Sequence, residues 1–422
     1  MHILKKNTVL EKLLKTHGAE LAAFEELAVE TVQNGVDSGT MVLLANPSHK
    51  GVTPTLIGQP AAIKVNANIG TSPLANDPEL EVRKLQLAVR AGAHAVMDLS
   101  IGGDLERIRG KILSQCPVPL GTVPIYSVAQ RYIGAQKDPS AMRWEEILEE
   151  IAKQAEQGVD FMTVHCGVTR RAAELATSGD RILGIVSRGG SLLAKWMRDN
   201  GRENPLYERY DEILEIALQH NVVLSLGDGM RPGAGADAGD PAQWEEVVVL
   251  AELATRAREA GVQVMIEGPG HVPLHQVQAQ IQSIKNLCSG APLYVLGPLT
   301  TDISPGYDHI AGAIGGAMAG FFGADFLCYL TPAEHLTLPC ENDVWQGVKA
   351  SLVAAHAAEV ALGRGPAVTR NNKMSQARRD LDWEAMEALA LDPTLVAERR
   401  KEFRHKEECA MCGEFCAVKL LK

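Results

Sequence analysis

Short apolar runs alternate with segments of helical periodicity along most of the chain. The runs are rich in β-branched residues and occupy residues 61–70, 93–100, 118–126, 159–167, 183–190, 222–231, 262–271, 293–301 and 324–332. Between them, apolar residues recur every three or four positions, as in residues 78–92 and 144–158, which both end in the glycine that commonly terminates a helix. Uninterrupted apolar strands that alternate with helices predict parallel strands buried on both faces.

This rhythm predicts an α/β fold, a (β/α)8 barrel over residues 61–365, with an open doubly wound sheet as the second choice. Nine runs are one more than a barrel needs, and residues 183–190 are the shortest and weakest strand candidate. Residues 1–60 predict a small N-terminal region that is mostly helical and then loop-like. Residues 366–422 predict a charged, helical C-terminal region.

Residues 310–330 are long and apolar enough to suggest a membrane span, since only Asp325 is charged. The pattern changes at Gly323, from small residues at helical spacing to a short strand-like run. We therefore predict a helix followed by a buried strand, and no membrane span. Residues 1–18 lack the long apolar core of a secretory signal, so we predict a cytoplasmic protein.

The net charge and the cysteine content argue against two further classes of protein. The net charge of −11 argues against a nucleic-acid-binding protein, which would usually carry a basic face. Eight cysteines are too few and too scattered for a disulfide scaffold in 422 residues. We expect five of them to be buried thiols, because they lie mostly in apolar runs: Cys116, Cys166, Cys288, Cys328 and Cys340.

The other three cysteines, Cys409, Cys412 and Cys416, lie within eight residues in the C-terminal region. A disulfide would pair only two of them, and a structural zinc site would normally need a fourth ligand nearby. Closely spaced thiolates among polar residues are typical of a metal site in a reducing compartment.

Polar residues, together with Met97 and Gly189, collect where the predicted strands end. In chain order they are Asn66, Asn68, Met97, Asp98, Tyr126, His165, Ser187, Arg188, Gly189, Asp228, Arg231, Glu267, His271, Tyr294, Thr300, Thr301, Asp302, Glu334 and His335. A turn or a hydrogen-bonded core histidine would explain any one of them, but not their recurrence on nearly every strand. Because parallel barrels carry their chemistry at the carboxyl ends of the strands, we predict an active site there.

The segment Ser187–Gly190 offers glycine amides and the cation of Arg188, which together suit a phosphate group. A tight turn with a solvated arginine would have the same sequence, so both interpretations stay open.

The imidazoles of His271 and His335, with the carboxylate of Glu267, suit a divalent metal ion. His275 follows His271 at helical spacing, but Pro273 lies between them and interrupts a helix. We therefore do not predict His275 as a ligand.

Longer strings at these positions carry a family resemblance. They read NANIG, VMDLS, GTVPIY, GIVSRGG, SLGDGMRPG, VQVMIEGPGHVP, LGPLTTDISPGYDHI and CYLTPAEHL, and the cysteine motif follows them. In this order they resemble the thiamin-pyrimidine synthase family of radical S-adenosylmethionine (SAM) enzymes, from about residue 64 onward. The resemblance implies a (β/α)8 barrel, a homodimer, 5-aminoimidazole ribotide as the substrate, and an electron-donor protein of the flavodoxin or ferredoxin type.

The resemblance also implies roles for single residues. Substrate contacts fall on Asn68, Met97, Tyr126, His165, Ser187, Arg188, Gly189, Asp228, Arg231, Glu267 and Tyr294. A divalent metal, zinc or iron, falls on His271 and His335, and a [4Fe–4S] cluster on Cys409, Cys412 and Cys416. Three thiolates leave one iron open to SAM, whose cleavage gives the 5′-deoxyadenosyl radical. No residue is implied as a catalytic acid or base.

Two departures from the family pattern bear on the product. The cysteine motif is C-x2-C-x3-C, where C-x2-C-x4-C is usual, and the short N-terminal region lacks an R-x-G-x-I-T-x-E-M segment. On the N-terminal departure we expect the paralogue that makes 5-hydroxybenzimidazole, a precursor in anaerobic cobamide synthesis. The alternative is synthesis of the phosphomethylpyrimidine of thiamin, and a more distant one is a zinc-dependent barrel hydrolase.

Overall fold

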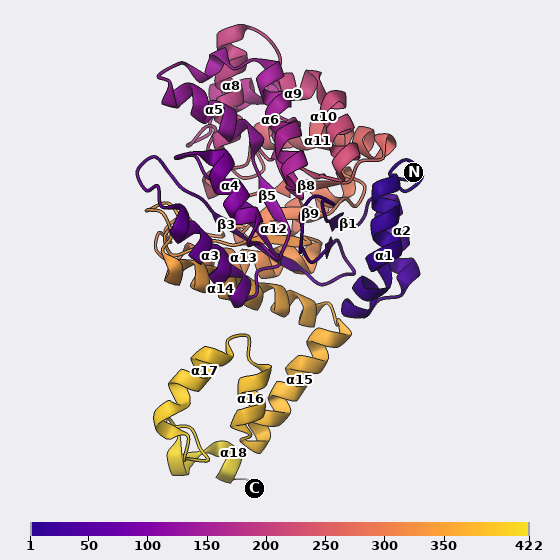
Figure 1. The fold of residues 1–422 in the computed structure, drawn as a ribbon. Coiled ribbons are helices and arrows are strands. Elements are labelled where there is room, and N and C mark those ends of the chain that lie inside the picture. Colours follow the sequence, from indigo (N-terminus) through magenta and orange to yellow (C-terminus); the bar gives the residue numbers. More distant parts are fainter. Residues whose placement is uncertain (1, 421–422) are drawn as a thin grey trace. The chain divides into compact units, whose positions relative to one another are not determined.

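The protein folds around a closed barrel of parallel strands (Figure 1). The structure, a computed structural model, describes residues 2–420. The chain divides between Ala355 and His356 into two compact units. The larger unit holds the barrel, and the smaller unit consists of the helices that follow it.

The barrel strands follow one another around the sheet in chain order. They are β3 (Lys64–Ile69), β4 (Ala95–Asp98), β5 (Leu120–Thr122), β6 (Phe161–Val164), β7 (Val223–Leu226), β8 (Val264–Gly268), β9 (Leu293–Leu296) and β10 (Phe326–Cys328). Strand β10 closes the barrel, because Phe326 is in register with both Lys64 of β3 and Tyr294 of β9. Every residue of β4 to β7 is buried, as expected for strands covered on both faces. The predicted (β/α)8 barrel is confirmed.

Helices connect successive strands and surround the barrel (Figure 1). In the larger unit they are α3 (Pro78–Ala91), α4 (Leu105–Leu113), α5 (Pro124–Gly134), η1 (Pro139–Ala141), α6 (Trp144–Gln157), α7 (Arg170–Ser178), α8 (Arg188–Asn200), α9 (Pro205–Glu208), α10 (Tyr210–His220), η2 (Gly235–Asp237), α11 (Pro241–Ala260), α12 (Leu274–Leu287) and α13 (Asp308–Phe322). Helix α14 (Glu341–Ala361) crosses the division between the two units.

Helix α3 shows how local sequence sets the ends of these helices. The Asp77 side chain accepts the backbone N–H of Glu79 at 3.0 Å, and Pro78 occupies the first turn, where its missing N–H costs nothing. Gly92 ends the helix at a φ of 105°, a conformation that other residues rarely adopt. The helices predicted over residues 78–92 and 144–158 are thus present as α3 and α6.

Residues 183–190, the weakest of the nine strand candidates, do not form a strand. Ser187 instead accepts the N–H of Gly190 at 3.1 Å and forms the N-terminal cap of α8. Just upstream, Arg181 donates to Asp240 at 2.6 Å, which ties the loop to the start of α11. The apolar residues of this run therefore lie in a loop and not in the sheet.

The N-terminal region contains α1 (Thr8–Phe24), α2 (Val29–Ser38) and a two-stranded antiparallel sheet of β1 (Val42–Leu44) and β2 (Thr55–Ile57). The helices agree with the prediction, but the small sheet was not predicted. Strands of three residues are too short to show alternation, so no periodic pattern marks them. Leu43 and Leu56 anchor this sheet in a core cluster that also contains Leu10 and Val32.

The apolar stretch at residues 310–330 divides as predicted. Helix α13 ends at Phe322, the Gly323 N–H is bonded back to Gly320, and β10 begins at Phe326. Among the residues that the structure describes, no helix is both long and apolar enough to cross a membrane.

The smaller unit is helical, in keeping with the sequence. It holds α15 (Gly365–Asp380), α16 (Trp383–Leu389), α17 (Pro393–Arg400), η3 (Lys401–Phe403), η4 (Gly413–Phe415) and α18 (Ala417–Leu420). One cysteine prediction fails in the larger unit: Cys340 is exposed, whereas the other four expected core thiols are buried. Cys340 directly precedes α14 and donates its N–H to the Asp343 carboxylate at 2.9 Å, so it belongs to a helix start and not to the core.

Candidate active site

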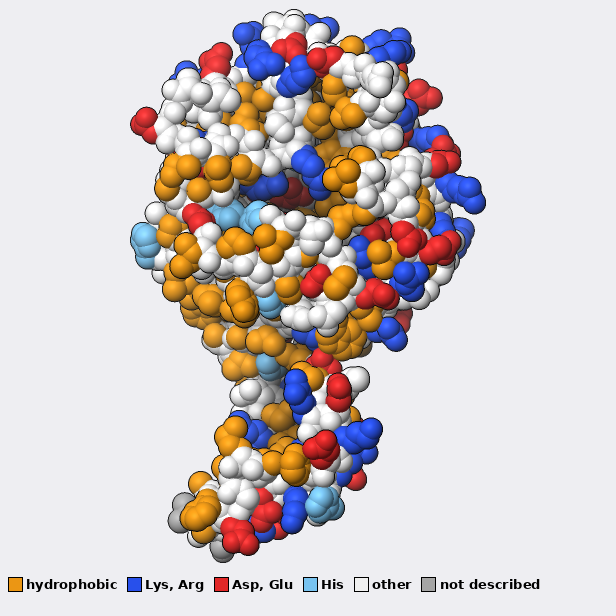
Figure 2. Space-filling view, turned by 90° about the vertical axis from the view of Figure 1, so that its left-hand side faces the viewer, with side chains coloured by type: hydrophobic (Ala, Val, Ile, Leu, Met, Phe, Trp, Pro, Cys, Tyr) orange, Lys and Arg blue, Asp and Glu red, His pale blue; other side chains and the backbone are white. Residues whose placement is uncertain are grey.

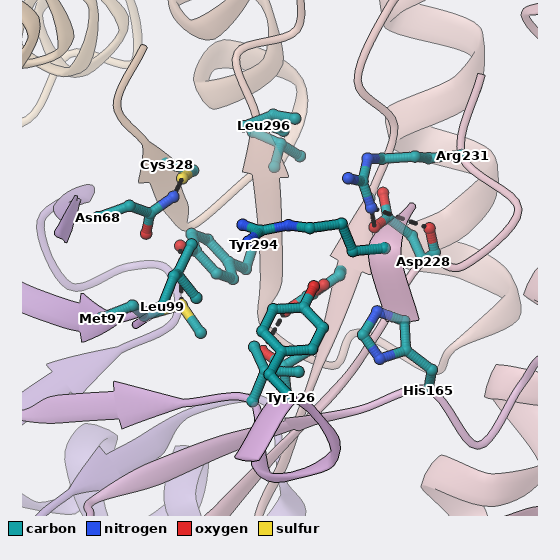
Figure 3. Close-up of a pocket in the computed structure, with 16 residues that line it drawn as sticks. Asn68, Met97, Leu99, Tyr126, His165, Asp228, Arg231, Tyr294, Leu296 and Cys328 are labelled. Carbon is teal, nitrogen blue, oxygen red and sulfur yellow. Dashed lines mark hydrogen bonds and ion pairs between the residues drawn. The ribbon is translucent and has the colours of Figure 1, made fainter. Parts of the chain in front are cut away.

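The barrel opens at the carboxyl ends of its strands into a polar pocket (Figures 2 and 3). All of the predicted substrate-contact residues line it except Ser187 and Gly189, namely Asn68, Met97, Tyr126, His165, Arg188, Asp228, Arg231, Glu267 and Tyr294. Figure 2 shows basic and acidic side chains inside this hollow and histidines at its rim. In Figure 3 the Asn68–Cys328 and Asp228–Arg231 pairs lie on opposite sides of the pocket.

Helix α8 places Arg188 at the pocket. It is the first residue of α8, and its guanidinium carbon lies 4.9 Å from the centre of the Tyr126 ring. Ser187 and Gly189 flank it but do not line the pocket; Gly189 packs so tightly on His165 that a Cβ there would come within 2.3 Å of the ring. The first residue of α8 therefore brings a cation to the cavity, which favours an anion.

Asp228 and Arg231 form an ion pair at the end of β7, with 3.2 Å between the carboxylate and the guanidinium. Burial raises the pKa of Asp228 to about 8, although Arg231 opposes the shift. The second carboxyl oxygen of Asp228 is buried and has no hydrogen-bond partner within the described chain. An orphaned buried oxygen beside a cavity is suited to a ligand hydroxyl or amine.

Glu267, near the end of β8, is held by hydroxyls from the two preceding strands. Thr163 of β6 donates to it at 2.6 Å and Ser225 of β7 at 2.9 Å. Burial raises its pKa, against the effect of these two donors and of Arg231. Thr163 and Ser225 were not predicted as site residues; the only signal was a hydroxyl residue inside an otherwise apolar strand.

His165 is buried at the end of β6. Burial lowers its pKa to about 3, and the nearby cations Arg231 and Arg188 act in the same direction. The ring is therefore a neutral imidazole, 3.2 Å from the hydroxyl of Ser187 through Nε2. Its Nδ1 has no partner among the described residues and remains available to a ligand.

The opposite wall is a chain of hydrogen bonds across β3, β9 and β10. Asn66 donates to Asn68 at 2.8 Å and to the Tyr294 hydroxyl at 2.7 Å, and Asn68 donates to Cys328 sulfur at 3.1 Å. The Tyr294 hydroxyl in turn contacts Met97 sulfur at 3.5 Å. Cys328, expected only as a core thiol, thus also lines the pocket.

His271 and His335 are brought together although 64 positions separate them, with ring centres 5.3 Å apart. Asp302 bonds to Nδ1 of His271 at 2.7 Å and Asp308 to Nδ1 of His335 at 3.4 Å. Histidines that bind metals are commonly oriented by carboxylates in this way, which leaves Nε2 for the ion. His335 also has a φ of 61°, a backbone strain that is concentrated at functional positions.

Glu267 does not join this histidine pair. Within residues 2–420 no three His, Cys, Asp or Glu side chains are gathered closely enough to hold one ion. His275, which we did not predict as a ligand, is exposed on α12. The two histidines fit a metal site that is completed by a substrate or solvent oxygen, as in open catalytic sites.

The cysteine motif lies in the smaller unit, and none of its three thiols forms a disulfide. The backbone N–H groups of Cys412 and Met411 donate to the sulfur of Cys409 and lower its pKa. The Cys412 thiol is hydrogen-bonded to Cys409, and its pKa is raised. Backbone amides commonly donate hydrogen bonds to the thiolates that bind iron–sulfur clusters. The three thiolates of a cubane cluster each bind a different iron, so the three sulfur atoms need not converge on one point.

Comparisons with known proteins agree with this geometry. Residues 7–422 match the Radical SAM ThiC family. Phosphomethylpyrimidine synthase of Desulfotalea psychrophila is 50% identical over 405 residues, which is 96% of this chain and 93% of that protein. The enzyme of the same name from Methanopyrus kandleri is 51% identical, over 96% of this chain and 95% of that protein. The one from Desulforudis audaxviator is 52% identical, over 95% of this chain and 94% of that protein.

These matches overturn the expectation of a 5-hydroxybenzimidazole synthase. The expectation depended on the departure in the N-terminal region, but relatives named phosphomethylpyrimidine synthase match 95% to 96% of this chain and 93% to 95% of their own length. The departure therefore does not distinguish the two activities. The matches likewise leave no support for a zinc-dependent hydrolase. The chain belongs to the Radical SAM ThiC family of enzymes, which use SAM and an iron–sulfur cluster.

Proposed function

We propose that the protein is a phosphomethylpyrimidine synthase, which converts 5-aminoimidazole ribotide to 4-amino-5-hydroxymethyl-2-methylpyrimidine phosphate for thiamin synthesis. The observation that carries the proposal is the identity of about half of all residues, over nearly the full length of both chains, with enzymes of that name. The pocket chemistry supports the same substrate.

The ribotide has a dianionic phosphate, ribose hydroxyls and an aminoimidazole ring, and the pocket offers a partner for each. Arg188, the first residue of α8, suits the phosphate. The carboxyl groups of Asp228 and Glu267 suit hydroxyl or amino donors. The neutral imidazole of His165 suits a donor or an acceptor on the ring.

We assign the [4Fe–4S] cluster to Cys409, Cys412 and Cys416 and a divalent metal, zinc or iron, to His271 and His335. When bound, the cluster supplies the electron that cleaves SAM to the 5′-deoxyadenosyl radical. The chain provides three cysteine thiols, the amide donors to Cys409, and a pocket for the substrate.

Further parts of the proposal concern partners and compartment. A homodimer would let one subunit complete the site of another, and an electron donor of the flavodoxin or ferredoxin type would reduce the cluster. All cysteines in the described chain are free, which suits a reducing cytoplasm.

Growth of a bacterial strain that lacks its own phosphomethylpyrimidine synthase tests the proposal. The gene for this protein should restore growth without added thiamin or hydroxymethylpyrimidine, and a Cys409→Ala, Cys412→Ala, Cys416→Ala variant should not. Growth that still requires the pyrimidine, in cells that contain the intact protein with its iron, would overturn the proposed product.

A further inference from the structure

The backbone just before the cysteine motif is held by two side chains of the smaller unit. Arg400 donates through Nη2 to the carbonyl of Lys406 at 2.8 Å and through Nη1 to that of Glu408 at 3.1 Å. Trp383 donates through Nε1 to the carbonyl of Glu407 at 2.8 Å. Three successive carbonyls of a segment outside any helix are thus satisfied by only two side chains.

The same two side chains hold each other. The Arg400 guanidinium carbon lies 3.7 Å from the centre of the Trp383 ring, close enough for a strong cation–π contact. Trp383 begins α16 and Arg400 ends α17, so the contact joins two helix ends. Asp382 caps α16 by accepting the N–H of Ala385 at 3.0 Å, which fixes the helix start that carries the tryptophan.

A second set of contacts closes the cysteine loop from its other end. Lys419 of α18, three residues after Cys416, pairs with Glu407 at 2.7 Å and also with Glu408. Cys416 is buried, and its carbonyl accepts the Lys419 N–H at 2.9 Å. The residues before and after the motif are therefore tied together without any contribution from a cysteine side chain.

We propose that Trp383 and Arg400 are positioning residues for the iron–sulfur cluster. They hold the cysteine loop in its folded form before iron binds, and so they slow the release of iron afterwards. Their contacts end at Glu408, directly beside the first ligand, Cys409. The inference rests on the proposed assignment of the cluster to the cysteine motif and adds the residues that support it.

Supporting residues of metal sites typically change affinity by about 10- to 100-fold when they are removed. After anaerobic reconstitution, Arg400→Ala should therefore release iron to a chelator about 10- to 100-fold faster than the wild type. The rate of iron release from Arg400→Lys should lie between those of the wild type and Arg400→Ala, because an ammonium group cannot bridge two carbonyls as a guanidinium does. Trp383→Phe keeps an aromatic face for Arg400 but loses the N–H donor, so it should also release iron faster.

Arg399→Ala is the matched control, because Arg399 is the exposed neighbour of Arg400 on the same helix and carries the same charge. It should release iron at the wild-type rate. Circular dichroism of the iron-free proteins checks that each variant folds. If Arg400→Ala has a reduced helix content, the rate of iron release from Trp383→Phe tests the inference. The electron paramagnetic resonance line shape of the reduced cluster should change in the Arg400 variants and not in Arg399→Ala.

Wild-type release rates in Arg400→Ala and Trp383→Phe would overturn the inference. An equal acceleration in Arg399→Ala would also overturn it, since loss of charge alone would then explain the effect. A wild-type protein that takes up no cluster would contradict the cysteine assignment itself, so the two failures are distinguishable.

Discussion

Arg188 is the residue on which substrate affinity should depend most strongly, because its cation lines the cavity. Arg188→Ala would remove the proposed charge-assisted hydrogen bond to the ribotide phosphate, which is worth about 1.5–3 kcal/mol. The dissociation constant of 5-aminoimidazole ribotide, measured by calorimetry, should rise about ten- to a hundredfold.

The control for that measurement is Arg171→Ala, which removes an exposed arginine from α7 and should leave the dissociation constant unchanged. An unchanged constant in Arg188→Ala would mean that residues 187–190 serve only to cap α8.

Asp228 should make stability depend on pH. Its pKa is raised to about 8 in the folded protein, against an ordinary value of 3.8. Folding therefore takes up a proton between these two values, and the contribution of Asp228 to stability falls as the pH rises through that window, by about 1.4 kcal/mol per pH unit. Asp228→Asn cannot titrate, so the unfolding free energy of the wild type relative to this variant should fall from pH 5 to pH 8 in urea titrations. A difference that stays constant would show that Asp228 is already ionised in the folded protein.

Sequence reasoning predicted the residues at strand ends because the barrel itself decides where those residues meet. Asn68 and Tyr294, for example, are 226 positions apart, yet both line the pocket. It missed Thr163 and Ser225, whose hydroxyls hold Glu267, because their role depends on neighbouring strands being in contact. Long-range partners of this kind have no local signature.

At the scale of elements, the loops after β8 and β10 deliver His271 and His335 to one place. A His271→Ala, His335→Ala variant should lose the mononuclear metal and keep the cluster iron, as measured by elemental analysis after anaerobic purification. His275→Ala should retain both metals, because His275 is exposed on α12. Unchanged metal content in the double variant would refute the histidine assignment.

Barrel strands and long helices were predictable because each has a periodic or continuous apolar pattern. Residues 183–190 were a strand candidate in the sequence, since an apolar loop that ends in a capped helix resembles a strand followed by a turn. The sheet of β1 and β2 was missed because three-residue strands carry no periodicity. The product was mispredicted from the sequence departure in the N-terminal region, although relatives named phosphomethylpyrimidine synthase match nearly the whole chain.

For the molecule as a whole, the proposed cluster ligands lie in the smaller unit and the barrel lies in the larger one, so we expect loss of the cluster to leave the barrel stable. Replacing Cys409, Cys412 and Cys416 by alanine should remove the iron and leave the thermal unfolding of the barrel unchanged. Cys340→Ala, at an exposed cysteine of the larger unit, should keep the full iron content. Iron retained at the wild-type level in the triple variant would place the cluster elsewhere.

The most direct test of the account is the product formed by the reconstituted enzyme. With 5-aminoimidazole ribotide, SAM and a strong reductant under anaerobic conditions, chromatography with mass detection should show 4-amino-5-hydroxymethyl-2-methylpyrimidine phosphate as the main product. The variant that lacks Cys409, Cys412 and Cys416 should form none. Cleavage of SAM by the intact enzyme without any pyrimidine phosphate, or with another main product, would contradict the account.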